Sequence, residues 1–297
     1  MLSAMQISLS SIRPIIAALL SLLLFSGCSS LRLAYNNGPQ LAWWWIDGYV
    51  DFGSEHEPRV KESLAQWFAW GRESQLPEVA ALLASAGAAM LEPTTPAQAC
   101  RWSERARQLA EPALERAVVL AAEHVPALGK AQFAQIEKRL RKNNAEMREE
   151  QAQADPAERS RAAIKRGVER AERLYGKVGE AQRRVIAAGV AASPFDVEVS
   201  FTEREKRQAE MLQTLRRLTT ERADRTQTTA ALRLLVEHME RSPRQAYRDY
   251  QQKLAAHNCA VTAELHNSTT PAQRQAARKQ LKEWEDDVRA LMAERAP

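Results

Sequence analysis

Residues 270–291 read TPAQRQAARKQLKEWEDDVRAL, a stretch that combines a helix start with a helical period. The hydroxyl of Thr270 can accept from the backbone N–H of Gln273, whose side chain can reach back, and Pro271 suits the first helical position. The apolar residues that follow recur at intervals of three and four: Leu281, Trp284, Val288 and Leu291. This spacing predicts an amphipathic helix.

The same signals recur along the chain. Thr95-Pro96-Ala97-Gln98 repeats the capping box, and Gly129 and Gly179 open weaker versions. Thr202-Glu203-Arg204-Glu205 and Ser242-Pro243-Arg244-Gln245 are variants. The intervals are irregular, so a solenoid of fixed period is not expected. We expect an all-α fold, an irregular multi-helix bundle of about nine or ten helices.

Two segments complicate this pattern. Pro112 and Pro126 should kink or break the helical region 96–128. Residues 197–201, Val-Glu-Val-Ser-Phe, are the one short candidate for a strand, and we expect an extended connection there. Elsewhere the 297 residues contain few glycines and no sustained strand alternation, which argues against a β-sandwich or barrel.

The first 27 residues predict a lipoprotein signal peptide. Arg13 is followed by an apolar stretch over residues 15–25, which is too short to span a bilayer. Phe25-Ser26-Gly27-Cys28 resembles the lipobox of bacterial lipoproteins, although Phe25 departs from the usual Leu. The resemblance implies lipidation of Cys28, with palmitate among the acyl chains. Ser29, where Asp would retain a lipoprotein in the inner membrane, implies an outer-membrane address facing the periplasm. An ordinary signal peptide or a short membrane anchor is the alternative.

Cys100 and Cys259 are the two remaining cysteines. In an oxidising compartment they are a candidate disulfide, and two buried free thiols are the alternative.

Charge divides the chain after the signal peptide. Residues 28–126 hold 8 Lys+Arg and 12 Asp+Glu, and residues 127–297 hold 33 and 25. We expect an aromatic-rich, membrane-proximal helical region at 28–126 and a basic helical region at 127–297, packed together as one unit. The densest basic run, 159–184, is either a solvated helix face or a surface for anionic lipid or an acidic partner. A periplasmic address argues against nucleic acid.

Nine of the 18 aromatic residues lie within residues 35–70. Successive helical residues turn by about 100°, so three consecutive tryptophans cannot all face one way. Either the cluster is all core, or it is core plus a membrane or partner contact. The candidate contacts are Trp43, Trp44, Trp45, Tyr49, Trp67 and Trp70.

Two family resemblances follow from these residues. Tyr35-Asn36-Asn37 and Trp44-Trp45-Ile46-Asp47-Gly48-Tyr49 behind a lipobox resemble the opening of a family of uncharacterised proteobacterial lipoproteins. In the later segment 70–77, Gly71 replaces that family's His. The two capping boxes also resemble the Leu-Thr-x-x-Gln motif of small helical periplasmic chaperones, but Thr94 and Thr269 stand where the Leu would be.

The sequence shows no nucleophile elbow, zinc motif, phosphate loop or Cys-x-x-Cys pair, so we name no catalytic residue, no metal ligand and no cofactor. The favoured hypothesis is a non-enzymatic binding or envelope-maintenance lipoprotein, held in the membrane through Cys28, with a polypeptide or envelope partner. A chaperone-like protein for unfolded clients is the alternative, and an enzyme acting on lipid or cell wall is the second alternative.

Overall fold

The computed structural model describes residues 30–151 and 155–294, so Cys28 and the predicted signal peptide lie outside the described residues. Within those ranges every regular element is helical, which confirms the all-α prediction. The α-helices are α2 (Ser30–Asn36), α3 (Gly38–Val50), α4 (Glu57–Trp70), α5 (Leu76–Ala89), α6 (Pro96–Ala121), α7 (Lys130–Gln151), α8 (Pro156–Tyr175), α9 (Glu180–Ala191), α10 (Val197–Thr220), α11 (Arg225–Glu240), α12 (Gln245–Asn267) and α13 (Pro271–Ala293).

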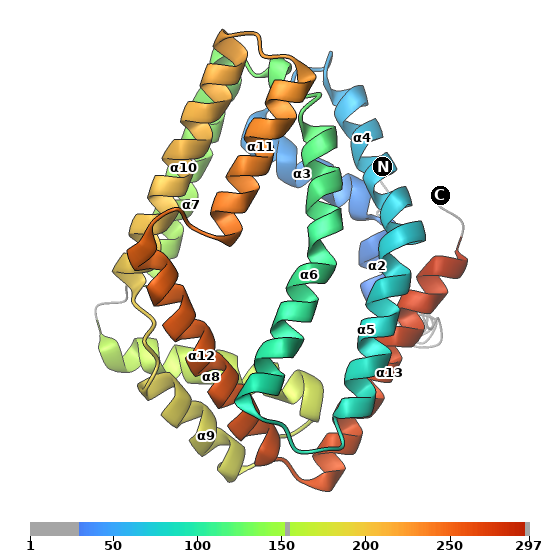
Figure 1. The fold of residues 1–297 in the computed structure, drawn as a ribbon, viewed down its shortest axis with the longest axis vertical. Coiled ribbons are helices and arrows are strands. Elements are labelled where there is room, and N and C mark those ends of the chain that lie inside the picture. Colours follow the sequence, from blue (N-terminus) through green and yellow to red (C-terminus); the bar gives the residue numbers. More distant parts are fainter. Residues whose placement is uncertain (1–29, 152–154, 295–297) are drawn as a thin grey trace, which may run out of the picture.

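A π-helical turn, Gly71–Gln75, joins α4 to α5 without a break. Counting this continuous segment once leaves eleven α-helices in the described residues (12 − 1), close to the nine or ten expected. In Figure 1 the helices form an elongated frame: α4, α5 and α13 follow one long side, and α7, α10 and α12 follow the other.

The capping boxes open helices where the sequence placed them. The hydroxyl oxygens of Thr95 and Thr270 accept from the backbone N–H groups three residues later, and both glutamine side chains return the bond. Helices also begin directly after Gly129 and Gly179. The capping signals therefore locate four helix starts correctly.

Three expectations about helix boundaries were wrong. Residues 197–201 are not an extended connection but the first turn of α10, because the Asp196 carboxylate accepts from the backbone N–H of Val199 and caps the helix. The start expected at Thr202 therefore lies inside that helix. The start expected at Ser242 falls at Gln245. Of the two prolines expected to kink or break the region 96–128, Pro112 lies inside the unbroken α6, whereas Pro126 lies in a separate 3₁₀ turn, Val125–Ala127, after α6 ends at Ala121.

The side of the frame that contains α5 and α13 is held together by residues far apart in sequence. Helix α13 lies along α5, and a shared core cluster joins Leu76 and Ala80 to Val288 and Leu291. Two further clusters of buried apolar residues lie around Val178 and Ile186, and around Phe133 and Leu218. The hydrophobic core is thus divided into clusters along the frame.

A polar network fixes the corner at which α8, α12 and the α5–α6 connection meet. The hydroxyl of Tyr175 lies 2.9 Å from Nδ1 of His266, and Nε2 of His266 lies 2.8 Å from the carbonyl oxygen of Glu92. Burial raises the pKa of Tyr175 to about 12, although Arg274 opposes the shift. Both ring nitrogens of His266 therefore have a hydrogen-bond partner, although the ring is buried.

Close helix packing at Gly189 supports a stability prediction. A Cβ at this position would lie 2.7 Å from Cγ1 of Val261, so α9 and α12 approach more closely than alanine allows. We expect Gly189→Ala to lower the free energy of unfolding by about 1–2 kcal/mol, because overpacking outweighs the gain in helix propensity. Chemical denaturation would measure the change.

Gly48→Ala is the matched control for this prediction. Gly48 is also helical, but nothing lies within 4 Å of its Cβ position. We expect this variant to gain about 0.5–1 kcal/mol from helix propensity alone. A Gly189→Ala variant that gained as much would contradict the packing argument.

Candidate functional site

The three consecutive tryptophans divide between core and solvent. Trp43 is 5% exposed, stacks on Phe52 with ring centroids 6.4 Å apart, and lies beneath the ammonium group of Lys61. Trp44 and Trp45 are 62% and 65% exposed. The all-core alternative is therefore excluded, and a membrane or partner contact at Trp44 and Trp45 stays a prediction.

The other candidate aromatic residues are partly buried. Tyr49 packs against Trp45 at 4.9 Å, lies under Arg139 and has its hydroxyl within hydrogen-bonding reach of the Asn143 amide. The indole N–H of Trp67 donates to the carbonyl oxygen of Ala113 at 2.9 Å. Trp70 is also partly buried. Of the six candidates, only Trp44 and Trp45 are exposed over most of their surface.

These two tryptophans belong to a set of exposed positions on two consecutive helices. We call it the α2–α3 stripe. The exposed positions of α2, α3 and the residue between them are Ser30, Leu31, Leu33, Ala34, Asn37, Gln40, Leu41, Trp44, Trp45 and Gly48. None of these ten positions is charged. Within each helix, most of these positions are three or four residues apart and so share one face of that helix. Leu31, Leu33 and Leu41, which the sequence analysis did not single out, are 39%, 64% and 46% exposed.

Contacts at both helices hold the stripe on the body. A Cβ on Gly38 would lie only 2.2 Å from the ring of Phe68, so glycine lets α3 pack closely on α4. Glu294, at the end of α13, pairs with Arg32 and accepts from the Asn36 amide at 2.7 Å. Arg72 donates to the Asn36 side-chain oxygen at 2.9 Å. The stripe therefore has a fixed orientation relative to α13.

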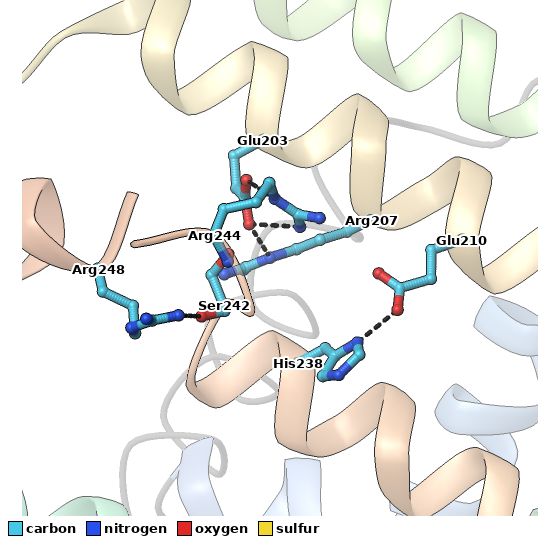
Figure 2. A network of polar contacts seen from close by, with 7 residues as sticks. All are labelled: Glu203, Arg207, Glu210, His238, Ser242, Arg244 and Arg248. Atoms are coloured by element: carbon cyan, nitrogen blue, oxygen red, sulfur yellow. Dashed lines mark hydrogen bonds and ion pairs between the residues drawn. The ribbon is translucent and has the colours of Figure 1, made fainter. Parts of the chain in front are cut away.

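A buried carboxylate joins α10 to the α11–α12 connection, as Figure 2 shows. The side chain of Glu203 is 4% exposed and accepts from Arg244 at 2.6 and 2.7 Å and from Arg207 at 3.0 Å. Arg248 donates to the carbonyl oxygen of Ser242, which is fully buried beside this group. The pair of His238 and Glu210 lies next to it.

The surroundings of Glu203 explain its acidity. Burial alone would raise the pKa of this carboxyl, but hydrogen bonds from Arg244 and Ser242 and the charges of Arg244 and Arg207 lower the pKa to about 2. The carboxylate is thus ionised and engaged by protein donors on both oxygens. We interpret this network as a structural clamp between helices.

One contact has the form of a catalytic pair. The hydroxyl of Ser63 lies 2.8 Å from Nε2 of His124, and burial lowers the pKa of His124. A nucleophilic serine also needs a group that orients the base. Among the described residues, no hydrogen bond reaches Nδ1 of His124, and neither residue lines a described cleft. The described residues also contain no cluster of three or more potential metal ligands.

The structure joins Cys100 to Cys259 by a disulfide, with the two Cα atoms 5.3 Å apart. The bridge links the beginning of α6 to the C-terminal half of α12. No helix in the described part of the chain is long and apolar enough to cross a bilayer.

Over residues 30–151 and 155–294, the chain is thus helical, is bridged by a disulfide and exposes the uncharged α2–α3 stripe. Residues 48–248 match the model of a family of unknown function, DUF6279, and the chain belongs to that family. The match begins within the tryptophan-rich segment and includes Glu203 and Arg244. No curated protein and no solved structure matches the chain.

Proposed function

We propose that this protein is an outer-membrane lipoprotein that faces the periplasm and acts as a non-enzymatic binding or envelope-maintenance protein. The observation that carries the proposal is the α2–α3 stripe. Its first residue, Ser30, comes two positions after the predicted lipid attachment at Cys28. The acyl chains would therefore bring this uncharged, tryptophan-bearing face to the membrane surface before any other part of the described chain.

The chemistry of the stripe suits a lipid interface. Tryptophan combines a large apolar ring with an N–H donor, and it is enriched where membrane meets water. The exposed leucines add apolar area, and the lack of charged positions avoids the cost of desolvating ions. Two or more acyl chains supply stable attachment, so the stripe would set orientation rather than affinity. Since Glu294, Arg32 and Asn36 hold α2 on α13, orienting the stripe would orient the body.

The experiment uses the full lipidated protein in vesicles of phosphatidylethanolamine and phosphatidylglycerol that carry brominated acyl chains. Bromine quenches tryptophan fluorescence only at close range, so we expect strong quenching in wild type. The double variant Trp44→Phe/Trp45→Phe should lose most of the quenchable signal. Trp284→Phe is the control, because Trp284 lies on α13 and is partly buried.

The lipid-facing stripe and the lipid anchor are tested separately, and one result would overturn each. Equal fractional quenching in wild type and the double variant would show that the stripe does not face lipid. Mass spectrometry of the mature chain tests the anchor, and an unmodified Cys28 would remove it. A Cys28→Ala variant should leave the membrane fraction.

A further inference from the structure

A groove runs between α8, α9, α12 and the segment 193–198 that leads into α10. Its volume is about 1070 Å³, which is at the upper end for small-molecule pockets. The lining residues of α8 extend from Arg159 to Tyr175, so the groove follows that helix for about 24 Å at 1.5 Å per residue. The three helices gather at one end of the frame (Figure 1).

The floor of the groove is apolar and built from small side chains. Helix α8 contributes Ala163 and Ala171, α9 contributes Val190, and α12 contributes Val261 and Leu265. These residues are buried or partly buried, so the floor is a packed surface. Such a floor accommodates the apolar face of an amphipathic ligand.

One rim of the groove is positively charged. Arg166 and Arg170 line it, one helical turn apart, and both side chains are exposed. Neither forms an ion pair with any described residue, whereas Arg161 and Arg183 on the same helical pair are bound to acids. The lining also includes Asp196 and Glu198, but Asp196 caps α10 and Glu198 pairs with Arg148. The rim thus holds two adjacent arginines that form no ion pair with a described residue.

We propose that this groove binds an acidic amphipathic helix of a partner protein. A helix of about 16 residues matches the length of the groove along α8. Its apolar face would cover the alanine and valine floor, and carboxylates one turn apart would pair with Arg166 and Arg170. An amphiphile with one headgroup would need charge at one end. Arg159 at the end of the α8 lining is already engaged by another group, and Arg166 and Arg170 lie near its middle. The proposal does not depend on the membrane attachment proposed above.

Binding of designed peptides tests the proposal on the full chain. The probe is a labelled 18-residue helix with a Leu/Ala face flanked by glutamates, and its partner peptide replaces every flanking glutamate by lysine. Fluorescence anisotropy should show micromolar binding of the acidic peptide, which weakens with added salt, and at least tenfold weaker binding of the lysine peptide.

Variants locate the site. Arg166→Glu/Arg170→Glu should weaken binding of the acidic peptide by about tenfold or more, since two attractions become repulsions. Arg173→Glu is the matched control: it is exposed on the same helix, has no ion pair with a described residue and does not line the groove. Ala163→Phe should fill the floor and abolish binding, with circular dichroism confirming the helix content of each variant.

Three outcomes of these binding experiments would overturn the proposal. These outcomes are no acidic-peptide binding at 100 μM, equal binding of the acidic and lysine peptides, or equal losses from the control and rim variants. If a fluorescent fatty acid bound in the groove and the acidic peptide did not, the groove would be assigned to a small amphiphile instead.

Discussion

Replacing both Cys100 and Cys259 by serine is expected to lower the free energy of unfolding by about 4–5 kcal/mol. The two residues are 159 positions apart, so the bridge restricts a very long loop of the unfolded chain. For a protein of this size, each kcal/mol corresponds to roughly 2–4 °C in Tm, and the double variant should therefore melt roughly 10–20 °C lower. Thermal melting followed by circular dichroism would measure this loss.

Reductant provides the control for this loss. Dithiothreitol should lower the melting temperature of wild type to that of the double serine variant and leave the variant unchanged. If reductant opens the bridge in wild type, as alkylation and mass spectrometry would show, but the melting temperature stays constant, the bridge does not carry this stability.

The second large effect concerns Glu203. Glu203→Gln is expected to lower the free energy of unfolding at pH 7 by about 3 kcal/mol, because it leaves two arginines beside a neutral amide at a nearly buried position. The expected value agrees with the acidity of the carboxyl. A group that titrates near 2 when folded and near 4.5 when unfolded stabilises the fold by about 3 kcal/mol above pH 4.5.

The pH dependence distinguishes this explanation from a general packing defect. Since the folded pKa is the lower one, the contribution is present above about pH 4.5 and is lost as the pH falls toward 2. Urea denaturation of wild type and variant should therefore give a difference that shrinks between pH 5 and pH 3. Glu205→Gln, an exposed position on the same helix, should have little effect. A difference that stays constant over this range would exclude the ionic explanation.

Local signals predicted much of the fold because they act over a few residues. The boxes at Thr95 and Thr270 depend on atoms three positions apart, and the structure has helices at both. The start of α10 was missed because Val197, Val199 and Phe201 favour extended chain, whereas the Asp196 cap and burial of Phe201 outweigh that preference. The strand propensity of a few residues is a weak guide where a helix cap and a core contact both favour a helix.

The sites were less predictable because their residues meet only after folding. Periodicity showed that the three tryptophans must diverge, but not that Trp43 would face Phe52. Glu203 and Arg244 are about 40 positions apart, and in the sequence each belongs to a variant of the helix capping box. The basic run at 159–184 was visible in the sequence, but the unpaired state of Arg166 and Arg170 depends on which acids the neighbouring helices supply.

The packing of α13 along α5 also constrains the order in which the chain matures. The two helices are separated by about 180 residues, so α5 emerges from the ribosome long before the surface that covers Leu76 and Ala80 exists. Contacts at such separation slow folding and leave apolar surface uncovered meanwhile. Until α13 arrives, this face of α5 is a point at which a nascent chain can be held by a chaperone or cut by a protease.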